Sequence, residues 1–218
     1  MTKPAPAAGW HLSNDRRFAD RAADHLRARF VEGETRMNPS LQYAQAIHGR
    51  TTGRGTGVID TIHLVEVAQA VGFVERSGAL SKADAGAVRN WFAECLRWMT
   101  TSKNGLEERD TKNNHAVCWG MQVAAFARLT GDSGQMDYVR ERFRTVYVPN
   151  QEAEDGSFPA ELARTKPYGY SLFNLEAMAA ICQILSRPGE DLFTWALPDG
   201  RGIGRAVEIR LSRIRRSG

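Results

Sequence analysis

Apolar side chains recur along this chain mostly at the spacing of a helix and almost never in strict alternation. Residues 15–30 give the clearest example, because Phe18, Ala22, Leu26 and Phe30 follow one another at steps of four. Such a stripe marks one face of an amphipathic helix, whereas a half-buried strand would place apolar residues at every second position. The pattern therefore predicts an all-α fold.

Further helices are predicted by the same spacing together with residues that start and stop helices. Ser81 followed by Asp84 resembles an N-terminal capping signal, and the segment 170–185 is apolar on most sides, as in a buried helix. We expect helices at about residues 59–74, 81–99, 114–129, 135–147 and 170–185, and a short last helix after Gly200. Helices joined in sequence predict stacked antiparallel hairpins, as in a toroid or a solenoid. No repeat of fixed length is found, which counts against the common solenoids.

We divide the chain into a flexible leader at residues 1–10, a helical domain at 11–208 and a basic tail at 209–218. Residues 32–57 form a long polar loop, and such loops in a compact domain are usually functional or disordered. Its polar side chains could bind the hydroxyls and carboxylates of a sugar, or could equally pin the loop to the helices beneath: Asn38, Tyr43, Gln45, Arg50 and Arg54. The sequence leaves both interpretations open.

The composition is ordinary for a globular protein of 218 residues, with 42% hydrophobic and 25% charged residues. The formal net charge of +4 mildly favours an anionic partner, such as a polyuronate, a nucleic acid or a lipid surface. However, residues 205–216 carry five arginines and one glutamate and are interpreted as a frayed basic terminus. Neither a basic face interleaved with aromatics nor a known motif for nucleic acid is found, so we expect no nucleic-acid partner.

The sequence shows none of the signals of a membrane span, a signal peptide or a metal site. We find no apolar run long enough to span a membrane, and residues 1–8 lack the apolar core of a signal peptide. The three cysteines, Cys95, Cys118 and Cys182, are widely spaced and surrounded by apolar residues. We therefore expect buried free thiols, no metal site and no cofactor.

The strongest functional signal is a set of polar side chains at the beginnings of predicted helices: Asn113, Asn114, His115, Arg164 and Tyr170. This set suits removal of the weakly acidic proton beside the carboxylate of a uronic acid, with expulsion of the neighbouring oxygen. Loss of that proton turns the carboxylate into an enolate-like dianion, so donors such as Asn, His and Arg must neutralise it where the charge develops. Arginine can also grip a carboxylate with two parallel hydrogen bonds.

Tyr170 can supply both the base and the acid of the elimination, by losing its proton first and returning it later. Because a free tyrosine has a pKa of about 10, its phenolate needs nearby positive charge, and Arg164 lies six positions earlier. Simpler roles are open for each member: the amides could cap a helix, Arg164 could lie on the surface, and Tyr170 could be a core aromatic. Asn113 and Tyr168 are expected to contact the substrate, although Tyr168 could instead stabilise its loop.

In these motifs the chain resembles the alginate lyase superfamily of polysaccharide lyases, which fold as an (α/α) toroid. The matches fall in family order and cover residues 10–208, and together they are specific, although each alone would be weak. They comprise Met37-Asn38-Pro39, Tyr43-Ala44-Gln45-Ala46-Ile47, Gly53-Arg54-Gly55, Ile59-Asp60-Thr61, Asn113-Asn114-His115, Asp155-Gly156, Glu161-Leu162-Ala163-Arg164-Thr165, Tyr170-Ser171-Leu172-Phe173-Asn174-Leu175-Glu176-Ala177 and Leu197-Pro198-Asp199-Gly200-Arg201.

The resemblance implies β-elimination on a polyuronate such as alginate, polymannuronate or glucuronan, without a cofactor, leaving an unsaturated sugar at the new non-reducing end. It implies Asn114, His115 and Arg164 as carboxylate neutralisers and Tyr170 as the proton-transferring residue. For mannuronate one tyrosine can serve as base and acid, whereas for guluronate or another epimer His115 could be the base and Tyr170 the acid.

Members of this family are usually longer, with several helices before the first matching motif, so the resemblance implies an incomplete toroid that is truncated at its N-terminus. They are typically periplasmic or secreted, although this chain itself does not indicate a location. Two other hypotheses stay open. The chain could be a non-catalytic remnant that binds anionic polysaccharide, or a helical scaffold for protein partners.

Overall fold

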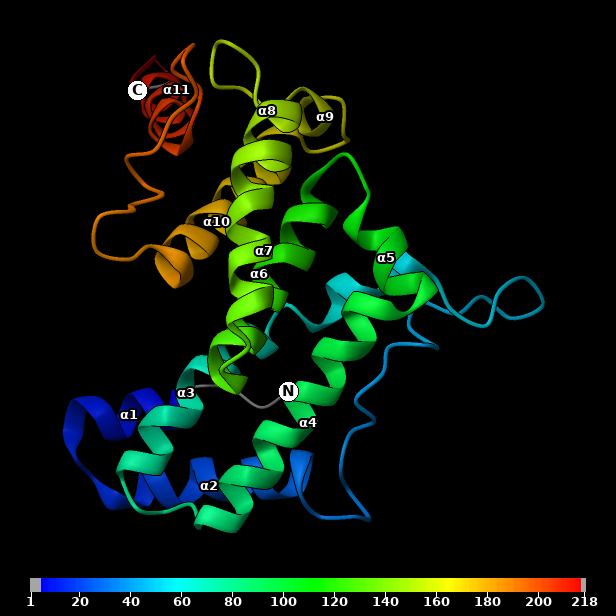
Figure 1. The fold of residues 1–218 in the computed structure, drawn as a ribbon, viewed down its shortest axis with the longest axis vertical. Helices are drawn as coiled ribbons and strands as arrows, with labels where there is room; N and C mark the ends of the chain where they lie inside the picture. Colours follow the sequence, from blue (N-terminus) through cyan, green and yellow to red (C-terminus); the bar gives the residue numbers. More distant parts are fainter. Residues whose placement is uncertain (1–4, 217–218) are drawn as a thin grey trace. The chain divides into compact units, whose positions relative to one another are not determined.

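The structure is a computed structural model that describes residues 5–216, with side chains described as far as residue 209. Figure 1 shows the order of the helices. The described residues form no strand, and β-type pairing is limited to two isolated bridges, Ile47 with Thr51 and Arg187 with Glu190. The predicted all-α fold is therefore confirmed.

The helices fall into two compact units, of which unit 1 comprises residues 5–105 with Ala125–Asp132 and unit 2 comprises Leu106–Ala124 with residues 133–216. The chain begins with α1 (Ala5–Ser13), α2 (Arg16–Phe30), the 3-10 helix η1 (Gly55–Thr61), α3 (Leu64–Arg76), α4 (Lys82–Thr101) and α5 (Lys103–Arg109). It continues with α6 (Asn114–Thr130), α7 (Ser133–Arg142), the π-helical segment η2 (Phe143–Tyr147), α8 (Val148–Gln151), α9 (Pro159–Leu162), α10 (Pro167–Leu185) and α11 (Ile203–Arg216).

The core of unit 1 is a cluster of buried aromatic rings on α2, α4 and the last part of α6. The ring centroid of Phe92 lies 5.3 Å from that of Phe30 and 5.0 Å from that of Phe126, and Trp91 packs edge-on against Phe30. Such pairs stabilise a core beyond the area that they bury. The indole N–H of Trp91 donates to the carbonyl of Met37 at 2.7 Å, which fixes the beginning of the long loop to this core.

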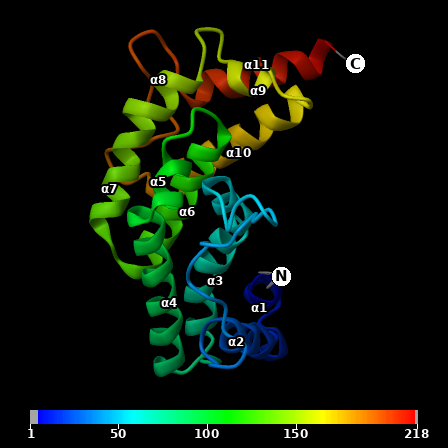
Figure 2. The same cartoon turned by 90° about the vertical axis from the view of Figure 1, so that its right-hand side faces the viewer.

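Unit 2 is organised around Arg142, whose guanidinium lies over the rings of Trp119, Tyr138 and Tyr147 at 5.5 to 6.0 Å from their centroids. Its Nη2 donates to the carbonyl of Arg109 at 2.9 Å, which fixes the end of α5. Helix α10 contacts α7, α9 and α11 (Figure 2). Its buried residues confirm the predicted buried helix: Ser171, Asn174, Ala177, Met178, Ile181, Cys182, Ile184 and Leu185.

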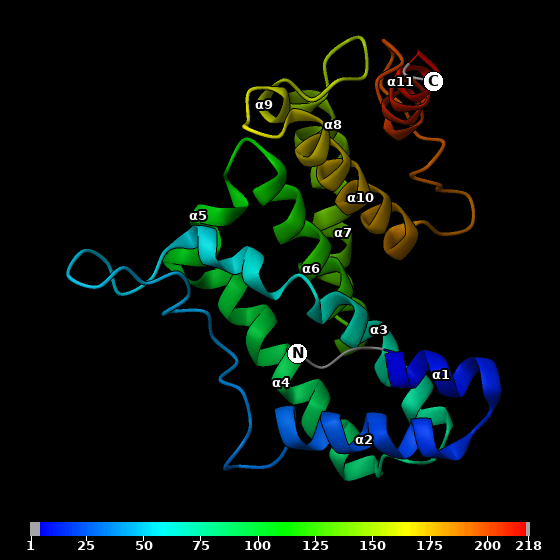
Figure 3. The same cartoon turned by 180° about the vertical axis from the view of Figure 1, so that it is seen from behind.

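The predicted flexible leader is wrong for residues 5–10, which belong to helix α1, while residues 1–4 lie outside the described part. Ala5, Ala7 and Ala8 favour a helix because alanine has the highest helix propensity. Helix α1 also packs alongside α2 (Figures 1 and 3), and this tertiary contact is invisible to periodicity.

The segment between the helices predicted at 81–99 and 114–129, and the basic tail at 209–218, also differ from prediction. Helix α5 occupies residues 103–109, and its seven residues are too few to show a clear period. Helix α11 runs to Arg216, so the backbone of the predicted tail is helical as far as it is described, whereas residues 217–218 lie outside. The predicted helices at 59–74 and 135–147 exist, but the first follows a 3-10 helix and the second continues into η2.

One segment, Gly55–Arg76, is long and apolar enough by composition to cross a membrane, with a mean hydropathy of 1.4 in its most apolar window. The expectation that no run reaches this length was wrong by that criterion. However, 44% of this window is buried, and η1 and α3 divide the segment. Core helices of soluble proteins pass the same test, so the segment is weak evidence for a membrane.

The three cysteines are buried free thiols, as predicted. Burial raises the pKa of the Cys95, Cys118 and Cys182 thiols to about 12. Because the thiolate is the reactive form, these side chains are chemically inert in the folded protein.

Replacement of Ser81 tests the start of α4. Its Oγ accepts a hydrogen bond from the backbone N–H of Asp84 at 3.0 Å. Ser81→Ala removes this cap and should lower the free energy of unfolding by about 1 kcal/mol, as measured by urea denaturation. Ser81→Asp keeps an acceptor and should stay close to the wild type; equal losses in both variants would contradict a capping role.

A buried carboxyl in unit 2 makes stability depend on pH. Glu152 is 3% exposed. Burial raises the pKa of its carboxyl from 4.5 to about 7, while the backbone N–H of Gly202 and the charges of Arg201 and Arg205 act in the opposite direction. Between these two values the folded state binds more protons than the unfolded state, so this group makes stability fall as pH rises from 4.5 to 7.

Glu152→Gln should therefore stabilise the protein above about pH 7, by a few kcal/mol at most, and the gain should disappear towards pH 4.5. Denaturation in urea at a series of pH values measures the difference. Glu154→Gln, at an exposed position two residues later, is the matched control. A gain that does not depend on pH would show that Glu152 is not the titrating group.

Candidate active site

The turn that begins α6 is anchored to α9 by a buried carboxylate. The backbone N–H and the side-chain Nδ2 of Asn114 both donate to Glu161, at 2.6 and 2.7 Å. Each of the two residues is 1% exposed. A carboxylate at this position satisfies an otherwise free N–H in the first turn and interacts favourably with the helix dipole. The sequence-predicted Asn114 is therefore fixed, with one of its two amide hydrogens directed at Glu161.

His115 is held by a second buried carboxylate, that of Glu108 on α5. Its Nδ1 lies 2.7 Å from Oε1 of Glu108, and the side chains of His115 and Glu108 are 18% and 0% exposed. Which of these two atoms carries the hydrogen depends on the tautomer of the imidazole. The backbone N–H of His115 donates to Oδ1 of Asn113 at 3.3 Å.

A buried amide on α8 connects the same turn to α10. Nε2 of Gln151 donates to the carbonyl of Asn113 at 3.0 Å, and its Oε1 accepts from Nδ2 of Asn174 at 3.2 Å. Both Gln151 and Asn174 are buried. Within the described residues, Oδ1 of Asn174 and the hydroxyl of Ser171 have no hydrogen-bond partner. A buried polar network of this kind restricts its members to one arrangement.

Arg164 and Tyr170 are brought together on the other side of Glu161. The guanidinium carbon of Arg164 lies 4.1 Å from the ring centroid of Tyr170, which is within cation–π distance. The backbone N–H of Arg164 donates to the carbonyl of Glu161 at 3.1 Å. Tyr170 lies in the first turn of α10, where its N–H donates to the carbonyl of Lys166. The positive charge expected beside this phenol is therefore present, over the face of its ring.

Unit 2 thus assembles the sequence-predicted residues in two groups. Asn113, Asn114 and His115 form the first group, and Arg164 with Tyr170 forms the second. Glu161 joins them, because its side chain binds the first group and its carbonyl binds the backbone of the second. Tyr168 is 46% exposed in the first turn of α10, where it is accessible to a ligand.

In unit 1, Gln45 and Arg54 hold the long loop together. Arg54 donates to the carbonyl and to the side-chain oxygen of Gln45, both at 3.0 Å, and Nε2 of Gln45 donates to Asp60 at 2.9 Å. Gln45 has a φ of 51°, which is uncommon for a residue other than glycine, and these hydrogen bonds stabilise that conformation. For Gln45 and Arg54, the structure therefore shows contacts that hold the loop to itself and to the helix η1.

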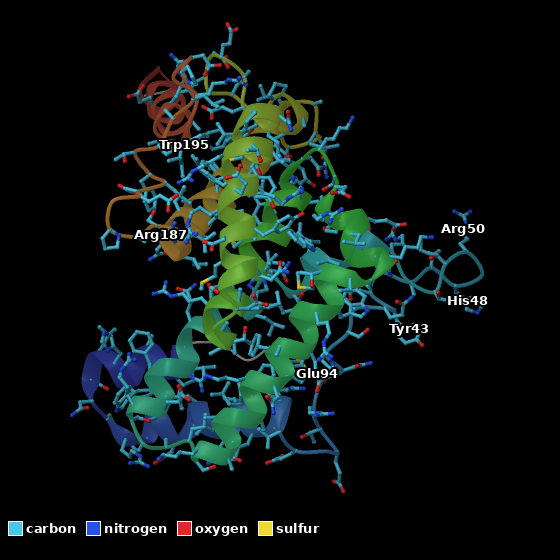
Figure 4. The ribbon with its side chains drawn as sticks, in the orientation of Figure 1. Tyr43, His48, Arg50, Glu94, Arg187 and Trp195 are labelled. Atoms are coloured by element: carbon cyan, nitrogen blue, oxygen red, sulfur yellow. The ribbon has the colours of Figure 1, made fainter. Side chains whose placement is uncertain are left out.

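The remaining candidates of the loop are Asn38, Tyr43 and Arg50, which are exposed. Tyr43 is 71% exposed. Figure 4 shows Tyr43 and Arg50 on the projecting part of the loop, together with His48. This arrangement leaves their side chains available to a ligand, and their role in substrate binding stays a prediction.

Sequence reasoning missed Glu108 and Gln151 as members of the site, and it quoted Glu161 and Asn174 without a role. Glu108 lies seven positions before His115, but no helix was predicted between residues 99 and 114. Gln151 had no distinguishing signal. Among the described residues, no group of three or more His, Cys, Asp and Glu side chains could hold a metal ion.

The anchoring of Asn114 can be tested by stability. Asn114→Ala removes the Nδ2 donor and leaves a buried carboxylate oxygen of Glu161 without that partner, which should lower the free energy of unfolding by roughly 1–3 kcal/mol. Asn150→Ala, at an exposed position on α8, should change the midpoint of urea denaturation little. Equal small effects in both variants would contradict the anchoring.

The comparisons with known proteins show the family of the chain. A family model described as alginate lyase matches residues 3–216. Among solved structures, the chain is similar to an alginate lyase from Bacteroides ovatus, with a TM-score of 0.91 and 33% sequence identity; the match covers 97% of this chain and 56% of that one. No curated protein matches the chain. The expected all-α toroid class is confirmed by this likeness. The chain belongs to the alginate lyase family.

Proposed function

We propose that this chain carries the active site of a polyuronate lyase that cleaves its substrate by β-elimination. Membership of the alginate lyase family supports the reaction class, while the chain spans 56% of the length of the crystallised lyase that it matches. The observation that carries the assignment is the connected set in unit 2, in which Glu161 links Asn114 to the segment that places Arg164 over Tyr170.

Neutralisation of the substrate carboxylate falls to three donors in this proposal. His115 offers Nε2, because its Nδ1 is bonded to Glu108. Asn114 offers the second hydrogen of its amide, because the first is bonded to Glu161. Arg164 adds a guanidinium that can bind two carboxylate oxygens. Donors fixed in this way stabilise the growing charge without having to reorganise during the reaction.

Tyr170 transfers the proton in the same proposal. Its phenolate removes the hydrogen from the carbon beside the carboxylate, and the electron pair of that bond forms a double bond to the next carbon. The glycosidic oxygen leaves from that carbon and takes the proton back from the phenol, so no cofactor is needed. The guanidinium of Arg164, 4.1 Å from the ring centroid, supports the phenolate electrostatically.

The stereochemistry of the uronate decides whether one residue performs both proton transfers. In mannuronate the proton and the leaving oxygen are on the same side, so Tyr170 alone suffices. In guluronate they are on opposite sides, and His115 then becomes the base with Tyr170 as the acid. The hydrogen bond from Nδ1 to Glu108 favours this second arrangement as well, because it leaves the lone pair of neutral His115 on Nε2.

The substrate in this proposal is an anionic polysaccharide such as alginate, polymannuronate or glucuronan. The net charge of +4 supports such a partner, as do the exposed Tyr43 and Arg50 on the long loop. A fully exposed arginine and an aromatic ring can bind a carboxylate and the face of a sugar, respectively.

Tyr170→Phe is the decisive variant for this function. It keeps the ring under Arg164 but removes the hydroxyl, so kcat should fall by roughly 10²- to 10⁴-fold or more, the range for a general acid–base group. Turnover is followed by the ultraviolet absorbance of the unsaturated uronate, with alginate, polymannuronate and glucuronan as substrates. Calorimetric titration with alginate oligomers should show nearly unchanged binding.

Tyr138→Phe is the matched control, because it removes a partly exposed hydroxyl elsewhere in unit 2. Its kcat should equal that of the wild type. Wild-type activity in Tyr170→Phe would exclude Tyr170 from the chemistry. Binding of oligomers without turnover of any polyuronate by the folded wild type would support the non-catalytic remnant instead.

A further inference from the structure

Glu108 is a buried carboxylate of unit 2 that contacts the imidazole of His115, and the proposed reaction gives it no role of its own. Its side chain is 0% exposed and lies on α5, outside every motif that the sequence singled out. Oε1 lies 2.7 Å from Nδ1 of His115, and Oε2 has no hydrogen-bond partner within the described residues. Burial of a carboxylate is costly unless it is paired, so its placement against one nitrogen of a site histidine calls for a reason.

We propose that Glu108 is a positioning residue that keeps a proton on Nδ1 of His115 and thereby makes Nε2 the atom that His115 presents to the substrate. This inference rests on the proposed lyase function for its catalytic consequence. The proton on Nδ1 is a property of the protein alone.

The backbone that carries Glu108 is held by two hydrogen bonds. The hydroxyl of Thr111 donates to the carbonyl of Glu108 at 2.9 Å. Arg142 donates to the carbonyl of the next residue, Arg109, at 2.9 Å. Oδ1 of Asn113 accepts a hydrogen bond from the backbone N–H of His115 at 3.3 Å. The backbones that carry the carboxylate and the imidazole are thus held by separate contacts, and the hydrogen bond between the two side chains selects the orientation of the ring.

The electrostatics of the pair exclude one of the two neutral forms of histidine. With the hydrogen on Nε2, the lone pair of Nδ1 would point at the carboxylate oxygen and repel it. With the hydrogen on Nδ1, the contact is a charge-assisted hydrogen bond. Neutral His115 then presents the lone pair of Nε2, as a base requires, and protonated His115 presents the N–H of Nε2, as a carboxylate donor requires. Both proposed roles of His115 therefore use the same atom.

The proton can be located by nuclear magnetic resonance without any substrate. Long-range proton–nitrogen correlations of uniformly 15N-labelled protein at about pH 8, where free imidazoles are mostly neutral, distinguish a protonated Nδ1 from an unprotonated one. The signals of His115 are identified by their loss in His115→Gln. A protonated Nδ1 is expected. An unprotonated Nδ1 in the wild-type protein overturns the inference, whatever the activity.

Glu108→Gln tests the cause and the consequence together. The amide keeps the volume of the side chain but can donate as well as accept, so it no longer enforces a hydrogen on Nδ1. The unprotonated fraction of Nδ1 should rise, and kcat should fall roughly 10- to 100-fold, as for other groups that orient a catalytic ligand, with KM little changed. Glu107→Gln, at the exposed neighbouring position on α5, should keep both properties of the wild type.

The two readouts separate failure of this inference from failure of the proposed function. A wild-type protein with a protonated Nδ1 but no activity on any polyuronate removes the lyase and leaves the positioning intact. A Glu108→Gln variant that loses activity while Nδ1 stays protonated overturns the inference, because the loss of activity then has a cause other than the position of the proton on His115. A Glu108→Gln variant in which Nδ1 has lost its proton but kcat equals that of the wild type also overturns the inference.

Discussion

Two carboxylates buried at the start of α6 determine how the polar groups of unit 2 are arranged. Glu161 and Glu108 are 1% and 0% exposed, and a buried charge is tolerated only where donors surround it. The donors are Asn114 and His115, the first two residues of the helix. Loss of a donor would leave a buried charge without that partner, and loss of a glutamate would leave its donor unpaired, so the glutamates and their donors depend on one another.

The same pairs restrict the chemistry that the site can perform. In the proposed reaction, the bound uronate develops a second negative charge. It must be stabilised by N–H groups aimed at the oxygens, which is the kind of preorganised stabilisation that contributes most in enzymes. In this proposal, the hydrogen bonds that hold Asn114 and His115 serve that purpose.

The sequence predicted those features that repeat along the chain or sit at helix starts. Leu26 and Phe30 were placed on one helix face by spacing, and Ser81 and Asn114 were recognised at or near the starts of their helices. Glu108 escaped because α5 is too short for its period to be visible. Gln151 and Asn174 escaped because the hydrogen bond between them joins residues far apart in sequence. Single-sequence patterns report which face of a helix is buried, but not which distant residue completes a buried polar group.

The loop of unit 1 shows a similar limit. Gln45 and Arg54 could be named as polar loop residues, yet only the structure shows that their donors and acceptors are directed at each other and at Asp60. Gln45 adopts a left-handed backbone conformation, which its residue type does not indicate. Tyr43 and Arg50 are polar residues of the same loop, but their side chains are exposed. A role in folding and a role in recognition can therefore be assigned to neighbouring residues of one loop only after their contacts are known.

The burial of all three native thiols has a practical consequence. Because Cys95, Cys118 and Cys182 are inaccessible and their thiolates are strongly disfavoured at neutral pH, maleimide dyes and nitroxide spin labels should leave the folded protein unmodified. A cysteine introduced at the tip of the loop, for example in place of His48, would then be labelled selectively in the otherwise unaltered chain. Fluorescence or electron paramagnetic resonance could follow the movement of that loop as oligosaccharide is added.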